Sequence, residues 1–300
     1  MSSSFVVAES GPSQGREVAA GARFRFGRNW ARFLRLVDNQ RIEEAERSLQ
    51  AMLGCDRLDG KHFLDAGCGS GLFSLAAHRL GATVHSFDFD PDSVACTREL
   101  KRRYGQADSD WTIEEASALD ARFMETFRLQ ADIVYSWGVL HHTGSMWKAI
   151  DLAASTVAPG GQLFIALYNR QQVLSRWWLT VKKTYNRLPT GLQPMFVFPF
   201  FLYFTAVGAA ADLVKGRNPV LRFTGAGRRG MSIYRDTVDW VGGLPFEVAS
   251  PGEVVAFCRA RGLDLEVLRT VGGRHGCNEY LLRRLEIGPL PGWGDQRASQ

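Results

Sequence analysis

The sequence predicts an α/β protein built on a parallel sheet with helices on both faces. From His62 onward, short apolar runs alternate with longer segments of helical periodicity, which is the pattern of strands connected by helices. Runs such as QLFIALY are apolar almost throughout, which is typical of strands buried on both faces. The alternation stops after Asn169 and resumes at Ser250, so we expect one α/β core interrupted by a long insertion.

The individual elements follow from local signals. Apolar residues at helical spacing predict a first helix over Arg28–Leu53, which Gly54 ends. Ser250 as N-cap, a proline at the first helical position and Glu253 at the capping-box position predict the start of the last helix. The expected strands cover residues 62–66, 83–90, 132–139, 160–169, 263–271 and 278–284, and the helices of the core cover 71–82, 91–105, 146–157 and 250–262.

Composition indicates an ordinary globular protein. Of the 300 residues, 45% are hydrophobic and 22% charged, and 36 Lys and Arg against 31 Asp and Glu leave a net charge of +5. This excess is too small for a nucleic-acid-binding tail, so we expect no nucleic-acid partner. The five cysteines form no CxxC pair and no metal spacing, and their number is odd. We therefore expect no disulfide framework, no metal site and a cytoplasmic location.

Two segments stand apart from this pattern. Residues 1–22 are rich in Ser and Gly and lack the basic start and apolar core of a signal peptide, so we expect a disordered tail. Met195–Val214 is almost uncharged over a length that approaches a bilayer span. Pro199 and Asp212 argue against a lone spanning helix. We expect a buried lid helix here, with peripheral membrane or apolar-ligand contact through 195–214 as the alternative.

The segment FLDAGCGSG lies between a predicted strand and a predicted helix. Its three glycines, Gly67, Gly69 and Gly71, allow a tight turn with close backbone approach at a helix N-terminus, which suits a nucleotide cofactor. In the dinucleotide fingerprint the third glycine falls three positions after the second, where this chain has Leu72, so the spacing argues against NAD. We expect Cys68 to be a small residue at a crowded turn and not a nucleophile.

An acid ends the next predicted strand. Asp88 follows Gly71 by seventeen residues, at the strand end where a carboxylate accepts hydrogen bonds from both ribose hydroxyls. Asp90, before a proline, is better suited to cap the following helix. The segment EEASALD comes after a short apolar run and is expected to place Ser117 and Ala118 beside an adenine.

These motifs, followed in order by DIVYSWGVLHHT and VAPGGQLFIALYN, resemble the class I S-adenosylmethionine-dependent methyltransferases, of the small-molecule type. The resemblance covers residues 60–170 closely and 250–284 in outline. It implies a Rossmann-like sheet of seven strands, mostly parallel with an antiparallel last strand, carrying a largely helical insertion or lid. It also implies S-adenosyl-L-methionine as cofactor and a small-molecule acceptor as partner, and it leaves the oligomeric state open.

The resemblance assigns roles to residues of the core. The glycine loop lies against the methionine part of the cofactor, the acid after the second strand holds the ribose, and the aromatic residue beside it packs on the adenine. The pair after the third strand flanks the adenine edge, and the end of the fourth strand lines the pocket near the methionine moiety. In this order the residues are Asp65, Gly67, Gly69 and Gly71; Asp88; Phe89; Ser117 and Ala118; and Ser136 and Gly138.

Methyl transfer is an in-line displacement, so the protein has to align the acceptor and, where the acceptor carries a proton, supply a base. His141 and His142 follow the fourth strand at the ligand-binding edge and have the right pKa range for a base. The alternative is that one imidazole caps a helix or bonds the backbone. Tyr168 and Asn169, at the end of the fifth strand, are further candidates for orienting the acceptor, with strand packing as the alternative for Tyr168.

The insertion carries the basic excess. Residues 168–250 contain eleven Lys or Arg and four acids, a net of +7, which leaves the rest of the chain at −2. The same segment is rich in aromatic residues, and insertions at this place commonly shape the acceptor pocket in proteins that the chain resembles. Apolar walls with arginines suit an aromatic, quinone-like or lipid acceptor bearing a carboxylate or phosphate. A solvated basic face is the alternative.

The expected function is O-, N- or C-methylation of a natural-product, quinone-like or carboxylate-bearing molecule. The alternatives are intramolecular cyclisation of the cofactor with release of methylthioadenosine, and a membrane-associated binding module. The expected organisation is a tail over 1–22, a helical cap over 23–59, the cofactor-binding core over 60–169, the substrate-recognition insertion over 170–249, the last helix and strands over 250–284, and a tail over 285–300.

Overall fold

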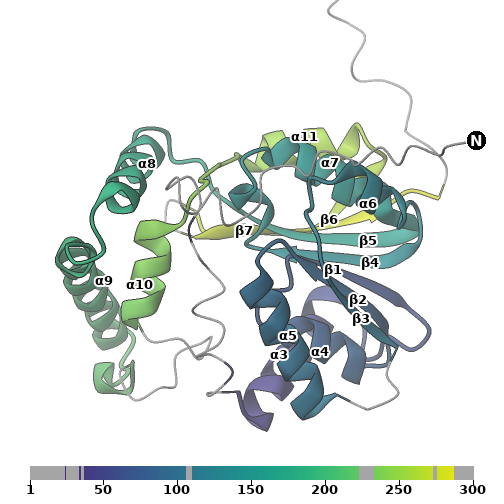
Figure 1. The fold of residues 1–300 in the computed structure, drawn as a ribbon, viewed down its shortest axis with the longest axis horizontal. Coiled ribbons are helices and arrows are strands. Elements are labelled where there is room, and N and C mark those ends of the chain that lie inside the picture. Colours follow the sequence, from purple (N-terminus) through teal and green to yellow (C-terminus); the bar gives the residue numbers. More distant parts are fainter. Residues whose placement is uncertain are drawn as a thin grey trace, which may run out of the picture.

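Among the residues that the structure describes, seven strands form one sheet in the order β3-β2-β1-β4-β5-β7-β6 (Figure 1). The computed structural model describes residues 24, 34, 37–105, 110–222, 233–272 and 276–286. The expected tail over 1–22 lies outside them, and so does most of the expected tail over 285–300.

Strands β1 to β5 pair in parallel, and β7 runs antiparallel to both β5 and β6. Their bounds are β1 His62–Ala66, β2 Thr83–Asp88, β3 Trp111–Glu115, β4 Ala131–Trp137, β5 Val157–Tyr168, β6 Leu263–Arg269 and β7 Cys277–Arg284. The predicted fold class is confirmed. The strand order changes direction between β1 and β4, and α/β folds bind ligands beyond the carboxyl ends of the strands at such a switch point.

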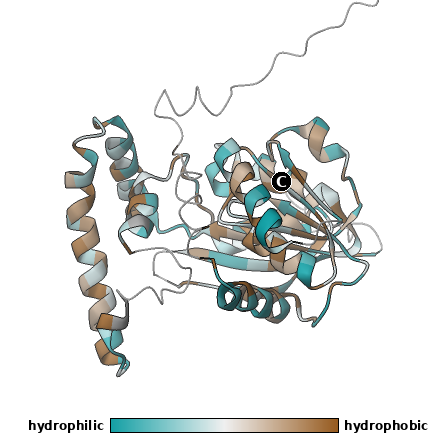
Figure 2. Cartoon of the chain, turned by 60° about the horizontal axis from the view of Figure 1, so that its bottom comes forward, coloured by the Kyte–Doolittle hydropathy of each residue, from teal (hydrophilic) through white to brown (hydrophobic). Residues whose placement is uncertain are grey.

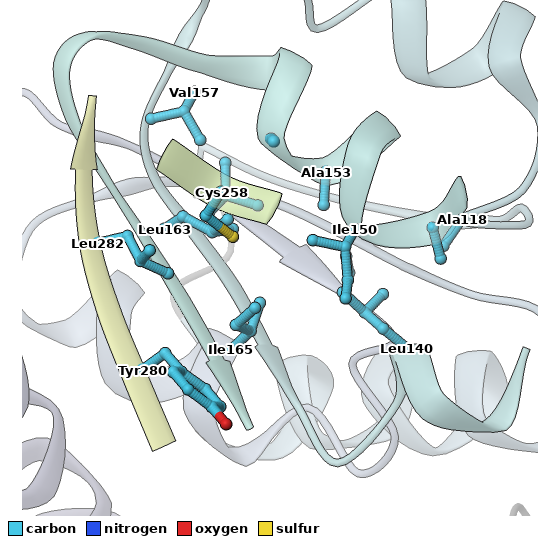
Figure 3. Close-up of a cluster of buried hydrophobic side chains, with 14 of the residues drawn as sticks. Ala118, Leu140, Ile150, Ala153, Val157, Leu163, Ile165, Cys258, Tyr280 and Leu282 are labelled. Carbon is cyan, nitrogen blue, oxygen red and sulfur yellow. The ribbon is translucent and has the colours of Figure 1, made fainter. Parts of the chain in front are cut away.

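Helices cover both faces of the sheet, and each set encloses its own apolar core. On one face lie α3 Asn39–Leu53, α4 Leu72–Arg79 and α5 Pro91–Tyr104; on the other lie α6 Ala121–Glu125, α7 Met146–Thr156 and α11 Pro251–Arg259. In the second core, Ile150 and Ala153 of α7 and Cys258 of α11 gather over Leu163 and Ile165 of β5 (Figure 3). The sheet is therefore closed on both sides, and ligands reach it only at its edges.

Two predicted helix starts have the expected chemistry. The Ser250 hydroxyl accepts a hydrogen bond from the Glu253 amide at 3.4 Å, and the Glu253 carboxylate accepts one from the Ser250 amide at 2.8 Å, which completes a capping box. The Asp90 carboxylate accepts a hydrogen bond from the Asp92 amide at 2.9 Å. Asp90 is therefore the cap of α5, as expected.

The first helix differs from the prediction. Asp38 has extended backbone and its carboxylate accepts a hydrogen bond from the Arg41 amide at 2.9 Å, so α3 begins only after it, at Asn39. One continuous helix from Arg28 to Leu53 is therefore wrong. The apolar spacing continues on both sides of Asp38, because spacing alone does not show that the backbone of an N-cap residue leaves the helical conformation. Residues 28–33 and 35–36 lie outside the described part of the chain.

The insertion forms a helical layer beside the sheet (Figure 1). It consists of α8 Gln172–Arg187, α9 Gln193–Val214 and α10 Ile233–Gly242, with a short 3-10 turn, η2 Pro219–Arg222. These helices share a small aromatic core around Trp178 and Val197. The prediction of a buried lid helix over 195–214 is wrong, because Val197 is the one residue of α9 that the structure buries. α9 packs along one face only, on α8 and α10.

The capping box gives a test of the fold. Ser250→Ala removes the hydroxyl that accepts the hydrogen bond from the Glu253 amide. We expect the free energy of unfolding, measured in urea, to fall by about 1 kcal/mol. Ser145 is a matched control, because it holds the N-cap position of α7 without a side-chain cap bond. Ser145→Ala is expected to change stability by less than about 0.5 kcal/mol. Equal losses in the two variants would contradict the assignment.

Candidate functional site

The glycine loop after β1 is held in a conformation that only glycine tolerates. Gly67 has a φ of +86°, and a Cβ there would lie 2.3 Å from a methyl group of Val139, in the loop after β4. Gly71 has a φ of +78°, and its Cβ would lie 2.6 Å from Thr97 on α5. The Gly67 amide donates to the Phe87 carbonyl at 2.8 Å. The loop that follows β1 is therefore in direct contact with the end of β2, the start of α5 and the loop that follows β4.

Cys68, inside this loop, is buried and supports the turn. Its Sγ lies 3.3 Å from the Thr97 hydroxyl. Burial, with the nearby carboxylates of Asp88 and Asp65, raises the pKa of the thiol well above its ordinary value. A thiol with a raised pKa is a poor nucleophile, which agrees with the structural role predicted for it.

Asp88 lies at the carboxyl end of β2, next to the glycine loop. One carboxylate oxygen accepts a hydrogen bond from the Gly69 amide at 3.0 Å, and the other accepts one from the Asp90 amide at 2.8 Å. A carboxylate has about four acceptor positions, and these two bonds fix its orientation toward the glycine loop. Phe89, the next residue, is half-buried. The predicted ribose acceptor is therefore oriented by two backbone amides.

The turn after β3 reaches the same edge. The Ala116 amide donates to the Asp88 carbonyl at 3.0 Å, which brings the chain after β3 beside the end of β2. The Ser117 hydroxyl accepts a hydrogen bond from the Leu119 amide at 3.1 Å and stabilises the turn. The Ala118 side chain is buried in the core under α7 (Figure 3). The side chain of Ala118 is therefore occupied by packing, and any ligand contact there falls to the backbone.

Asp65 is buried beneath the glycine loop and is part of a hydrogen-bond chain. The Trp111 indole donates to Ser86 at 2.8 Å, Ser86 donates to Ser74 at 2.8 Å, and Ser74 donates to the Asp65 carboxylate at 2.5 Å. Burial raises the pKa of Asp65 to about 7, and the nearby Asp88 adds to the shift. Asp65 thus joins β1 to α4, β2 and β3 and supports the loop from below.

The end of β4 contributes two residues in different ways. Ser136 is fully buried, and its hydroxyl donates to the Ala66 carbonyl at 2.7 Å, so it ties β4 to β1. Gly138 has a φ of +75°, and apart from its chain neighbours no heavy atom of the described residues lies within 4 Å of the position that its Cβ would take. The backbone at Gly138 therefore borders open space at the switch point between β1 and β4.

The two histidines after β4, in the 3-10 turn η1 Leu140–His142, have different surroundings. His142 Nδ1 lies 2.5 Å from the Pro245 carbonyl, which makes Nδ1 the protonated nitrogen. His141 is fully buried, and no hydrogen bond of ordinary geometry reaches its ring nitrogens within the described part of the chain. Burial, with His142 and Lys182 nearby, lowers the pKa of His141 well below its ordinary value. His141 is therefore neutral at physiological pH, whereas His142 makes the backbone contact that we named as the alternative role.

Tyr168 and Asn169 end β5 with separate roles. The Tyr168 ring lies 3.9 Å from the His141 ring between centroids and 5.1 Å from that of Trp240. Asn169 donates to the Gly272 carbonyl at 2.8 Å and accepts a hydrogen bond from Asn278 at 3.1 Å, so its amide joins β5 to the β6–β7 turn. Tyr168 faces the insertion, and Asn169 holds the edge of the sheet together.

Residues 245–249, which we call the strap, connect the insertion to this edge. The Glu247 amide donates to the His141 carbonyl at 3.0 Å, and the Ala249 amide donates to the Tyr168 carbonyl at 3.1 Å. The strap is therefore bonded to the chain segments after both β4 and β5.

Lys182 of α8 is a site residue that the sequence did not single out. It is fully buried, and its Nζ donates to the Trp240 carbonyl. The same Nζ lies 4.8 Å from the ring centroid of Phe246, 5.0 Å from that of Trp240 and 5.9 Å from that of Tyr168. Burial lowers the pKa of Lys182 to about 7. A signal that could have identified Lys182 is the apolar spacing of Trp178 and its neighbours along α8, which places Lys182 on the buried face of that helix.

A hollow opens beside this aromatic group. Its lining residues are Tyr168, Asn169, Gln171, Ser175, Trp178, Trp240, Phe246 and Gly276. They come from the carboxyl end of β5, from α8 and α10, from the strap and from the β6–β7 turn. The hollow therefore lies where the insertion meets the sheet edge. It is next to Tyr168, which covers one side of the histidine turn.

Comparisons with known proteins agree with this geometry. A family model described as a methyltransferase domain matches residues 37–196. A ubiquinone biosynthesis O-methyltransferase of Xanthomonas campestris pv. campestris is 34% identical over 113 residues, which is 38% of this chain and 45% of that protein. The corresponding enzyme of Salmonella enteritidis is 33% identical over 115 residues, again 38% and 45%. The chain spans about 45% of the length of these curated relatives.

One solved structure shows the same fold over most of both chains. It is magnesium protoporphyrin IX methyltransferase from Synechocystis PCC 6803 with bound SAH, with a TM-score of 0.50 over 86% of this chain and 93% of that chain. At 15% sequence identity the likeness concerns the fold alone.

The contact between the glycine loop and Val139 is open to test. Gly67→Ala and Gly138→Ala both place a side chain at a positive φ, which costs about 1–2 kcal/mol. Only Gly67→Ala adds a clash, so we expect it to lower the free energy of unfolding by about 3 kcal/mol or more and Gly138→Ala by about 1–2 kcal/mol. Urea titration of the ligand-free protein measures both. Equal losses would show that Val139 yields freely.

Proposed function

Because the chain belongs to the family of class I S-adenosylmethionine-dependent methyltransferases, we propose that it methylates a small, partly apolar acceptor bound between the β4–β5 edge and helices α8 to α10. The observation that carries the proposal is the hollow at the carboxyl end of β5, the strand that pairs with β4 beside the switch point where the family binds its cofactor. We take residues 170–249 as the substrate-recognition insertion. We also propose a cytoplasmic location, which the odd number of cysteines without a CxxC pair favours.

The residues at the switch point between β1 and β4 fit the cofactor. S-adenosylmethionine, when bound, supplies a methyl group already activated by its sulfonium leaving group. Asp88 is oriented to accept the ribose hydroxyls, the loop at Gly67 and Gly69 permits close backbone approach, and Gly138 borders open space for the methionine part. Asp65 and Ser136, both buried, hold this loop and strand end in place.

The hollow suggests the class of acceptor. Four of its eight lining residues are aromatic, which favours a flat apolar ring. The Lys182 ammonium is fully buried and not part of the lining, but it lies against the rings of Trp240 and Phe246, and its positive charge behind them favours a phenolic or carboxylate group on the acceptor. A quinone-like or hydroxylated aromatic acid meets both conditions. The ubiquinone O-methyltransferase relatives support an oxygen as the methylated atom.

Proton removal from such an acceptor requires a neutral base at this edge. Burial lowers the pKa of His141, which makes that ring a weak base, whereas His142 donates Nδ1–H to the Pro245 carbonyl and so carries Nε2 as its unprotonated nitrogen. We propose that His142 receives the acceptor proton and that Tyr168 positions the ring. Neither of the alternatives, cyclisation of the cofactor or a non-catalytic membrane module, is supported by the relatives found.

Formation of S-adenosylhomocysteine tests the proposed function directly. We expect the protein to release it from S-adenosylmethionine in the presence of at least one member of a panel of catechols, hydroquinones and hydroxylated benzoates. Chromatography distinguishes this product from methylthioadenosine. Methylthioadenosine without any acceptor, or no thioether product with the whole panel, would contradict the proposal.

Asp88→Ala tests the cofactor site. Removing the carboxylate takes away the ribose acceptor, so we expect the calorimetric Kd for S-adenosylhomocysteine to rise at least tenfold, equivalent to about 1.4 kcal/mol. Asp92→Ala changes an exposed acid one turn away and serves as control, with an unchanged Kd. Unchanged affinity in Asp88→Ala would refute the ribose assignment.

Lys182→Met separates binding from stability. Because burial lowers the folded pKa of Lys182 from 10.5 to about 7, the unfolded chain binds this proton more tightly, and the buried amine increasingly destabilises the fold as pH falls from about 10 to 7. We expect Lys182→Met to raise the free energy of unfolding at pH 7 by about 1–4 kcal/mol and to lose this gain toward pH 10.

The same variant is expected to lower kcat/KM for an acidic acceptor at least tenfold. Lys183→Met, at the exposed neighbouring position, is the matched control and should change neither quantity. If Lys182→Met stabilises the enzyme and leaves kcat/KM unchanged, Lys182 has a structural role and does not contribute to acceptor binding.

A further inference from the structure

We propose that the exposed face of α9, together with Trp177 of α8, docks the protein on the surface of an anionic lipid bilayer, lying in the plane of the headgroups. We call this surface the α9 outer face. Its members are Pro194, Met195, Phe198, Pro199, Leu202, Tyr203, Ala206, Val207, Ala210, Ala211, Leu213 and Val214, all exposed. The proposal concerns where the protein binds and does not depend on the reaction that it catalyses.

The α9 outer face carries no charge. A surface helix of a globular protein normally turns charged and polar residues toward water. Here Met195 is 73% exposed, Phe198 54% and Leu202 50%, and the one polar group on this face is the Tyr203 hydroxyl. Among the described residues, α9 is also the helix that is long and apolar enough to cross a membrane. Figure 2 shows it at the outer edge of the molecule, hydrophobic over much of its length.

The opposite face of α9 is already used, so the helix cannot turn its apolar residues inward. Phe200 and Phe204 pack on Trp178 of α8, with ring centroids 5.7 and 6.0 Å apart. Asp212, the one charged residue of α9, is half-buried on this inner side. Since α8 and α10 are bound along α9 and carry charged residues, crossing the bilayer would draw those charges into hydrocarbon. An in-plane position avoids this cost.

Basic residues accompany the apolar face in the same helical layer. Arg176, Lys183 and Arg187 are exposed and lie on one strip of α8, at spacings of seven and four residues, and α8 contains no acid over its length. Lys215 and Arg217 follow the end of α9 and are exposed. An apolar helix followed directly by Lys215 and Arg217, in a layer whose helix α8 exposes Lys and Arg and carries no acid, complements acyl chains beneath anionic headgroups.

Aromatic residues lie at the boundary between the two zones. Trp177 is 47% exposed, and its ring centroid lies 6.1 Å from that of Phe200, so it adjoins the apolar face from the side of α8. Trp and Tyr favour the headgroup level of membranes, where the ring is apolar and the polar atom is hydrated. A second copy of the chain is a poorer occupant, because a symmetric contact would bring two sets of these cations together.

Vesicle flotation tests the proposal with the full chain. We expect the protein to float with vesicles of phosphatidylcholine and phosphatidylglycerol, and at least tenfold less with phosphatidylcholine alone or in 0.5 M salt. The triple variant Met195→Ser/Phe198→Ser/Leu202→Ser should lower binding to the anionic vesicles at least tenfold. The variant Arg176→Glu/Lys183→Glu/Arg187→Glu should lower it as well, and more strongly at low salt.

A matched control replaces exposed apolar residues on the surface of the α/β domain. Leu129→Ser/Val267→Ser/Leu268→Ser changes three side chains that are 45%, 36% and 37% exposed and lie away from α9, and it should float like the unchanged protein. Circular dichroism checks that every variant is folded. The proposal is overturned if the α9 variant floats normally, if the unchanged protein ignores anionic vesicles, or if sedimentation shows a dimer that only the α9 variant dissociates.

Discussion

The left-handed turn at Gly67 is the constraint on which the rest of the site depends. The space where a side chain would begin is filled by Val139, and the amide of the same residue is bonded to the end of β2. The loops after β1 and β4 and the end of β2 are thereby held against one another. The orientation of Asp88, the opening at Gly138 and the start of α4 all follow from that contact. Asp65 stabilises the arrangement from below through a chain of hydroxyl groups that ends at Trp111.

Much of the core could be predicted from the sequence because its signals are local. Strand and helix alternate in the order of the chain, the capping box at Ser250 involves residues three apart, and the choice between Asp88 and Asp90 follows from their distance to a proline. The number of strands and the antiparallel last strand came from a family resemblance, and the strand order was not predicted, since pairing between distant strands leaves no trace in periodicity. The roles of the site residues stay predictions, although the structure brings Asp88, the glycine loop and the turn after β3 to one edge.

What could not be predicted depends on tertiary burial. α9 is apolar on all sides, and apolarity alone does not distinguish a helix that the fold encloses from one that it leaves exposed, so the expectation of a buried lid was wrong. Lys182 shows the converse case. A lysine counts as a surface charge in any composition, and only the packing of α8 against Trp240 and Phe246 shows that its ammonium is enclosed by rings.

The strap has a consequence for how a molecule enters the site. Its backbone bonds fix it to the chain after β4 and to the end of β5. Access to the hollow past α10 therefore requires the ring contact between Tyr168 and Trp240 to separate, while the strap keeps Phe246 against Tyr168.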